Sequence, residues 1–476
     1  MSGHNTSMPI EIVEASKLAA VASVHLPNVT DLEFEASLTE LRELAKTLGY
    51  KVVRTFAQNR NAFDITGYLG IGKRQEIRAF VGDKPQSDQD AAAPTQGRMV
   101  AEPIGAIEAP AIEVLFVDHE ISPSQARNLE KAIGCEVMDR TMLILEIFRR
   151  NARTRVAVAQ VEMARLGYMA PRLREAAKLA GPQGRQRSGV GGRGAGESHT
   201  ELDRRKVRDR IAALQQEIAA MHVERETQRA RRQGSESPST LALVGYTNAG
   251  KSTLMRALTG SEVLVANRLF ATLDTTVRVL EPESVPRVLV TDTVGFIKNL
   301  PHGLVESFKS TLEEALDASL LLHVIDASDP GFERQLEVTE EVLRDIHADH
   351  VPRIKIFNKI DHVGDVEAQR EHTAALRGKY PDALVMSALR PEDVARLHGL
   401  IVSHFQQDLV EEELFVPWTA QQLRGEIFAH CEVLSERADA DGAFFRVRGA
   451  ARSIERLHEQ LGSTKVFGRA GSGQSI

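Results

Sequence analysis

Cysteine is scarce in this chain: two occur among 476 residues, Cys135 and Cys431. They lie far apart and lack the spacing of metal ligands, which argues against a disulfide framework and fits a reducing compartment. Long apolar runs are also missing, since stretches such as SLLLHVI at residues 319–325 are far shorter than the roughly 20 residues that a membrane span needs. The start of the sequence has no basic end followed by an apolar run, so secretion is not expected. We therefore expect a cytoplasmic protein without membrane insertion, and peripheral attachment to a membrane stays open.

Charge is unevenly distributed along the chain. The formal net charge is -7, yet residues 149–232 hold about twenty Lys and Arg against about ten Asp and Glu. A basic middle therefore lies between acidic ends. Such a segment either binds nucleic-acid phosphates or only keeps its helices solvated, and charge alone does not decide between the two.

The length predicts about three domains of roughly 150 residues each. Residues 1–140 alternate strand-like and helix-like segments, which indicates a small α/β domain with a flexible insertion at 84–110. Residues 141–235 carry two helical patterns, each with one narrow apolar seam: one at Ala152, Val156, Ala159, Met163 and Leu166, the other at Val207, Ile211, Leu214, Ile218 and Met221. Such helices can cover one another as an antiparallel hairpin, whose tip is the Gly- and Arg-rich stretch 181–198.

The second half continues the α/β pattern. Residues 236–408 alternate short apolar strands with helices, which predicts a mainly parallel sheet covered on both faces. Residues 409–476 contain a helix near 420–431, a strand at 443–447 and a helix at 453–461, which indicates a small α+β domain. The fold class is therefore α/β, with a nucleotide-binding domain flanked by smaller parts.

The segment GYTNAGKS, residues 245–252, follows an expected strand and precedes an expected helix. Glycines there let backbone amides surround phosphate at a helix N-terminus, with Lys251 reaching the β and γ phosphates and Ser252 binding Mg²⁺. A chance match in an unrelated glycine turn is the alternative. The later segment VLVTDTVG makes that unlikely, because it places Asp292 at a strand end, where it can hold Mg²⁺ through water, with Gly295 after it.

Two further segments complete the predicted nucleotide site. NKID, residues 358–361, ends in Asp361, whose carboxylate can accept two hydrogen bonds from guanine but finds no matching donors on adenine. The Thr-rich stretch 267–278 can order around the γ phosphate; Thr272 is the expected second Mg²⁺ hydroxyl, with Thr275 and Thr276 as alternatives. Lys251, Thr272 and Gly295 are the predicted catalytic residues.

The full predicted nucleotide-binding set comes from these segments and from the tripeptide 387–389. It comprises Gly245, Tyr246, Thr247, Asn248, Ala249, Gly250, Lys251, Ser252, Thr253, Phe270, Ala271, Thr272, Leu273, Asp274, Asp292, Thr293, Val294, Gly295, Asn358, Lys359, Ile360, Asp361, Ser387, Ala388 and Leu389.

Two positions bear on hydrolysis. Phe296 follows Gly295 and cannot orient water by hydrogen bonding, so slow intrinsic hydrolysis is expected, with the water positioned by an outside surface or another group. Asn248 lies in the phosphate loop, where a K⁺ ligand and a simple loop hydrogen bond are both open.

Taken in order, GYTNAGKST, FATLDTT, DTVGF, NKID and SAL resemble the motifs of translation-factor GTPases, and FATLD with DTVGF is similar to the HflX family. Segments of the front half, such as YLGIGK at 68–73 and DRTMLILEIF at 139–148, resemble that family too. The sequence departs from it at Ile71 and Ala195, where the family commonly has Lys and Pro, and at residues 198–200, where it commonly has Thr-Gln-Leu.

The resemblance implies a GTP-hydrolysing factor that binds the large ribosomal subunit and its RNA and, in some members, separates or rescues ribosomes under stress. Arg185, Arg187 and Arg193 in the hairpin tip are the expected RNA-binding residues. The expected ligands are GTP or GDP with Mg²⁺, and the expected state is a monomer. The alternative is a GTPase switch that regulates a protein partner or a membrane-associated complex.

Overall fold

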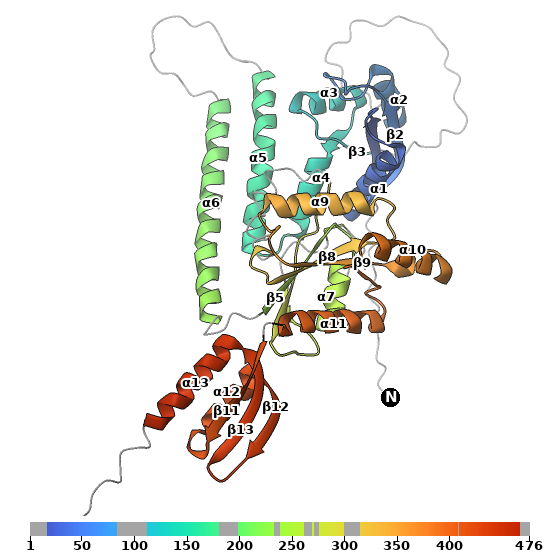
Figure 1. The fold of residues 1–476 in the computed structure, drawn as a ribbon. Helices are drawn as coiled ribbons and strands as arrows, with labels where there is room; N and C mark the ends of the chain where they lie inside the picture. The colour runs from blue at the N-terminus through green and yellow to red at the C-terminus, as the bar shows by residue number, and fades with distance from the viewer. Residues whose placement is uncertain are drawn as a thin grey trace, which may run out of the picture. The chain divides into compact units, whose positions relative to one another are not determined.

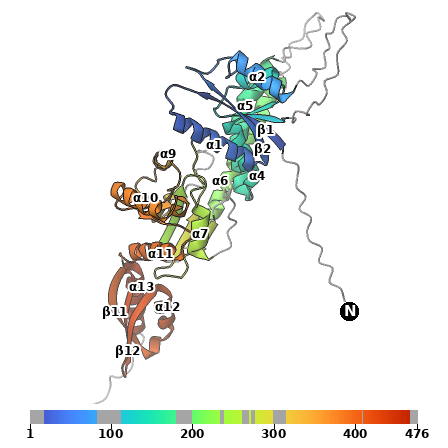
Figure 2. The same cartoon turned by 90° about the vertical axis from the view of Figure 1, so that its right-hand side faces the viewer.

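The computed structural model describes residues 17–82, 112–179, 199–232, 239–260, 269–270, 276–298, 315–407 and 409–466. Three separate β-sheets lie in this part of the chain (Figures 1 and 2). The chain divides into two compact units, one built mainly from Met1–Ala152 and Val158–Gln215, the other mainly from Gln216–Leu300 and Val305–Ile476. Each unit is described by itself.

The N-terminal sheet is parallel throughout, in the order β2-β1-β3-β4. Its strands are β1 (Lys17–His25), β2 (Tyr50–Asn59), β3 (Val114–Val117) and β4 (Glu136–Asp139), and its helices are α1 (Asp31–Thr47), α2 (Ile71–Val81), α3 (Pro123–Ile133) and α4 (Arg140–Asn151). The central strand β1 has six consecutive buried residues, as expected for a parallel strand covered on both faces. The predicted small α/β architecture is confirmed, while the insertion 84–110 lies outside the described residues.

Arg140, the first residue of α4, fills the carboxyl edge of this sheet. Its side chain is 2% exposed and forms ion pairs with Asp118 at 2.8 Å and with Glu40. Ser37 and Ser23 also donate hydrogen bonds to Asp118. Doubly wound sheets commonly bind ligands at this edge, next to the point where the strand order reverses. Here the protein's own side chains occupy that place.

Helices α5 (Arg155–Leu179) and α6 (His199–Arg232) form the expected antiparallel hairpin. Two ion pairs join them, Arg155 with Glu217 at 3.3 Å and Arg210 with Glu162 at 2.8 Å. Since the later residue on α5 pairs with the earlier one on α6, the helices run in opposite directions. The predicted seam is largely right, because Val156, Ala159 and Leu214 are buried. Ala152 was wrongly placed in it, because that residue is the C-cap of α4 and precedes the start of α5 at Arg155.

The second sheet has the order β10-β9-β8-β5-β7-β6, and only β6 pairs antiparallel with its neighbour. Its strands are β5 (Ser239–Gly245), β6 (Thr276–Val279), β7 (Val288–Asp292), β8 (Leu320–Asp326), β9 (Arg353–Asn358) and β10 (Leu384–Val385). The helices are α7 (Lys251–Thr259), α9 (Phe332–Asp345), α10 (Val366–Lys379) and α11 (Pro391–Gln406). Separate apolar cores line its two faces, which confirms the predicted mainly parallel sheet.

The third sheet is antiparallel, in the order β11-β13-β12. It consists of β11 (Leu409–Pro417), β12 (Cys431–Ala438) and β13 (Gly442–Ala450), with α12 (Gln422–His430) and α13 (Ala451–Val466) packed on it through one core. The expected α+β part is present, but β11 and β12 had not been predicted. Within the described ranges, no helix has the length and apolar character needed to cross a bilayer.

Candidate nucleotide site

The phosphate-loop segment connects the central strand β5 to helix α7, as predicted. Two of its glycines have conformations or contacts that exclude a side chain. Gly245 has φ +147°, and a Cβ there would lie 2.1 Å from the Val324 carbonyl oxygen; Gly250 has φ +97°, and a Cβ would lie 2.3 Å from Asn358 Nδ2. The loop can therefore run close to the neighbouring strand ends because these positions carry no side chain.

The Lys251 side chain folds back onto the phosphate loop. Its Nζ donates to the carbonyl oxygens of Gly245 at 3.0 Å and Tyr246 at 2.8 Å. Burial lowers the pKa of this ammonium to about 8, although the Asp292 carboxylate acts in the opposite direction. A buried cation held only by neutral carbonyls is poorly compensated, so phosphate oxygens at this place would be a better partner.

Ser252 and Asp292 meet beside the phosphate loop. The Ser252 hydroxyl donates to Asp292 Oδ2 at 2.8 Å, and Asp292 ends β7 directly alongside β5. Both are hard oxygen donors of the kind that Mg²⁺ prefers, so Ser252 could bind the ion directly while Asp292, beside it, holds the ion through water. Two of the three side chains that were predicted to serve Mg²⁺ are thus adjacent, and the third, Thr272, lies outside the described residues.

Asn358 links the predicted base-binding segments to the phosphate loop. Its Nδ2 donates to the Ala249 carbonyl at 3.0 Å, and its Oδ1 accepts from the Ala388 amide at 2.9 Å. Asp361 follows in a short helix, with a partly exposed side chain 3.5 Å from the His362 ring. The predicted residues of 245–253, 292–295, 358–361 and 387–389 therefore come together at the carboxyl ends of neighbouring strands.

Two residues of this site were missed from the sequence. Asp326, at the end of β8, pairs with Lys359 Nζ at 2.8 Å, and Asp393 on α11 accepts from the Ser387 amide at 2.9 Å. Asp326 thus fixes the predicted base-binding segment 358–361, and Asp393 fixes the segment 387–389. Asp326 could have been found, since it ends a buried parallel strand at the edge where the other loops lie.

The segment after Asp292 packs directly against the phosphate loop. A Cβ on Gly295 would lie 2.9 Å from both Lys251 Nζ and the Thr247 Cα. Phe296 is 2% exposed and packs in the core with Ala242 and Val244, so its side chain points into the protein. This fits the expectation that Phe296 cannot orient water.

Some predicted residues cannot be placed. Ala271, Thr272, Leu273 and Asp274 lie outside the described residues, as do Arg185, Arg187 and Arg193 of the hairpin tip. Phe270 is described and buried, with φ +56°. Thr253 lies in the first turn of α7.

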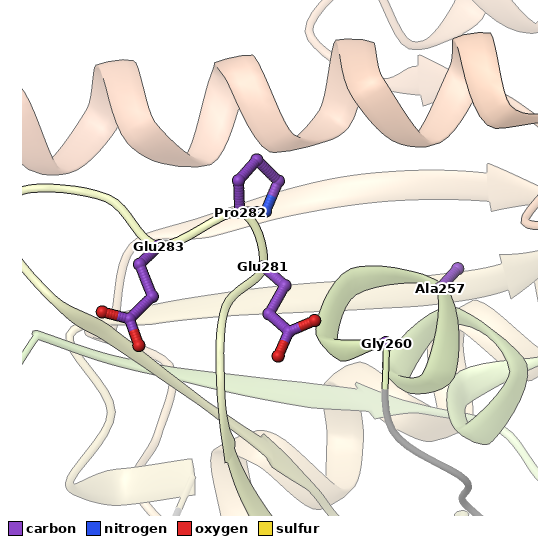
Figure 3. A pocket seen from close by; sticks show the side chains of 5 residues that line it. All are labelled: Ala257, Gly260, Glu281, Pro282 and Glu283. Carbon is purple, nitrogen blue, oxygen red and sulfur yellow. The ribbon is translucent and has the colours of Figure 1, made fainter.

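A separate hollow lies at the C-terminal end of α7, whereas the phosphate loop is at the N-terminal end of that helix (Figure 3). It measures about 570 Å³ and is lined by Ala257, Gly260, Glu281, Pro282 and Glu283. The Glu281 amide donates to the Leu258 carbonyl at 2.8 Å, which fixes this wall to α7. Two carboxylates at its rim repel phosphate, so this hollow is not part of the phosphate site.

A glycine-rich loop from the central strand, a strand-end aspartate beside it and an Asn-Lys-x-Asp segment facing it define a P-loop GTPase. Three sequence profiles match the chain: "GTP-binding GTPase N-terminal" at residues 35–149, "GTP-binding GTPase Middle Region" at 151–232 and "50S ribosome-binding GTPase" at 240–359. The chain belongs to the HflX family of GTP-hydrolysing enzymes.

Two relatives match nearly the whole chain. It is 50% identical to GTPase HflX of Gluconacetobacter diazotrophicus, over 93% of this chain and 98% of that protein. Identity to GTPase HflX of Escherichia coli is 34%, over 90% and 92%. A GTP-binding protein from Sulfolobus solfataricus, solved with GDP, aligns at 22% identity with a TM-score of 0.41, over 81% of this chain and 99% of its own.

Proposed function

We propose that this GTPase is a GTP-controlled factor that binds the large ribosomal subunit and separates or rescues ribosomes under stress. The observation that carries the proposal is the combination, in one chain, of the assembled nucleotide loops with a basic helical hairpin. The profile over residues 240–359 is described as a ribosome-binding GTPase, and the HflX relatives extend over the hairpin as well.

GTP binding is the first step of the proposed cycle. The Lys251 ammonium exchanges its two carbonyl partners for β and γ phosphate oxygens, and the Asp361 carboxylate accepts from the guanine N1–H and the exocyclic amine. Ser252 and Thr272 would bind Mg²⁺ directly and Asp292 through water. Bound there, Mg²⁺ would supply positive charge that offsets the charge of the phosphates.

Hydrolysis is proposed to need an outside surface. Because the Phe296 side chain is buried, the attacking water must be held by other groups, which predicts slow turnover in the free protein. Asn248, with φ +59°, is either a K⁺ ligand or a loop hydrogen-bonding residue. Equal turnover in sodium and potassium buffers would remove the K⁺ role.

Ribosome binding is assigned to the hairpin. Helices α5 and α6 together hold fourteen Lys and Arg against eight Asp and Glu, before the arginines of the tip are counted. A basic hairpin with a Gly-rich tip can follow closely spaced phosphates in folded RNA. We expect Arg185, Arg187 and Arg193 to contact that RNA.

A GTPase assay with and without purified large subunits tests this proposal. Turnover should rise strongly with subunits, and binding should weaken steeply between about 50 and 200 mM salt, because each phosphate contact releases counterions. The triple variant Arg185→Ala, Arg187→Ala, Arg193→Ala should lose the stimulation and keep the intrinsic rate. If subunits leave turnover unchanged in all buffers, the ribosomal role fails, and regulation of a protein partner becomes the better proposal. Light scattering of intact ribosomes with the protein and GTP tests splitting.

A further inference from the structure

Three hydrogen bonds join the phosphate loop to the segment that follows Asp292. The Phe296 amide donates to the Gly245 carbonyl at 3.1 Å, and the Thr247 amide donates to the Phe296 carbonyl at 2.7 Å. The Lys298 amide donates to the Tyr246 hydroxyl at 2.8 Å. The first two bonds form a short parallel bridge at Tyr246 and Phe296, and the third extends it by two residues.

Only the third bond depends on which residue occupies position 246. The two backbone bonds need amides and carbonyls alone, and any residue supplies those. The bond from the Lys298 amide needs the tyrosine hydroxyl as its acceptor. Phenylalanine would place the same ring there but has no oxygen to accept the bond. Tyr246 is 7% exposed, so its hydroxyl bonds in a protected place where a lost partner is costly.

The bond from the Lys298 amide to the Tyr246 hydroxyl holds the backbone three residues beyond Gly295, a predicted catalytic residue. Gly295 lies between Asp292 and the bridge, and it packs so closely on Lys251 and Thr247 that a Cβ would overlap both. Phe296 anchors the segment through its buried ring. On the Lys298 side, the Tyr246 hydroxyl is the contact that ties the backbone to the phosphate loop.

We infer that Tyr246 is a positioning residue for GTP hydrolysis. Its hydroxyl holds the Lys298 backbone, and through residues 296–298 it keeps Gly295 in register with Lys251. Tyr246 was expected from the sequence to contact nucleotide; the structure gives it a second partner inside the protein. The inference rests on the predicted catalytic role of Gly295.

The variant Tyr246→Phe removes the acceptor and keeps the ring. We expect kcat to fall about 3- to 10-fold, the effect of one net hydrogen bond, with KM and the Kd for GDP within twofold of the parent. Hydrogen exchange at the Lys298 amide should rise by a similar factor in the GDP-bound protein, where no catalysis is needed. Tyr50→Phe deletes the same group from β2, outside the GTPase sheet, and should change none of these quantities.

Two results would overturn the inference. One is unchanged exchange at the Lys298 amide in Tyr246→Phe, since the bond would then hold nothing. The other is a loss of GDP affinity as large as the loss of kcat, since Tyr246 would then act on the nucleotide itself. An intact kcat in Gly295→Ala would overturn the predicted role of Gly295 and, with it, the positioning role of Tyr246 through Gly295, whereas exchange at the Lys298 amide would still report on the bond itself.

Discussion

The tight contact of Gly295 with the phosphate loop gives a sharp prediction for Gly295→Ala. The new Cβ would lie 2.9 Å from Lys251 Nζ, 2.9 Å from the Thr247 Cα and 3.0 Å from its Cγ2. Ordinary contacts between carbon atoms are about 3.5 to 4.0 Å, so the segment must retreat by roughly 0.5 to 1 Å. A displacement of about 1 Å at a reacting centre can cost about 100-fold in rate, so we expect kcat to fall between about 10- and 100-fold.

Single-turnover hydrolysis of GTP, with GDP binding measured in parallel, is the assay for this variant. The Kd for GDP should change less than about threefold, because GDP lacks the γ phosphate near which Gly295 is expected to act. Gly378→Ala is the matched control, since Gly378 lies in α10 with no atom within 4 Å of its added Cβ. A kcat for Gly295→Ala within twofold of the parent would refute the close-contact argument.

Further predictions concern stability, protonation and the base-binding loop. Arg140→Ala should destabilise the N-terminal unit by about 3–5 kcal/mol in urea unfolding, because the buried Asp118 carboxylate loses its cation; an unchanged midpoint would contradict this. The lowered pKa of Lys251, about 8, means that the folded state releases this proton before the unfolded state does, so the Lys251 contribution to stability should increase as pH rises from about 8 to 10.5. GDP binding at pH 9 should take up protons in calorimetry, while binding at pH 6.5 should not, and Lys251→Met should abolish the uptake. Asp393→Ala frees the Ser387 amide and should weaken GDP and GTP binding equally, by about tenfold, in fluorescence titrations; a loss for GTP alone would be inconsistent with a base-side role.

Strand prediction worked where strands are buried on both faces. β8 has the bounds expected from its apolar run, Leu320–Asp326, because a central parallel strand needs apolar residues on each side. β11 and β12 were missed for the opposite reason. They are the outer strands of their sheet, and β11 carries three consecutive exposed glutamates, Glu411, Glu412 and Glu413, which interrupt any apolar pattern.

The individual loops of the site could be predicted from the sequence, whereas the contacts that join one loop to another could not. Each loop could be recognised because phosphate and guanine chemistry constrain residues close together in sequence. Asp326 and Asp393 escaped notice because they act on other loops of the fold, Asp326 on Lys359 and Asp393 on the Ser387 amide. The bond between Tyr246 and Lys298 spans 52 residues, and only the fold brings those two together.

We expect one carboxylate, that of Asp361, to select guanine for a nucleotide whose phosphates lie in the Gly245–Ser252 loop. Calorimetric titration of the purified protein and of Asp361→Ala, each with GDP and with ADP, tests it most directly. The parent should bind GDP and not ADP, and Asp361→Ala should lose at least about 100-fold in GDP affinity, because two hydrogen bonds to a charged group disappear. Equal binding of GDP and ADP by the parent, or unchanged GDP binding by Asp361→Ala, would contradict it.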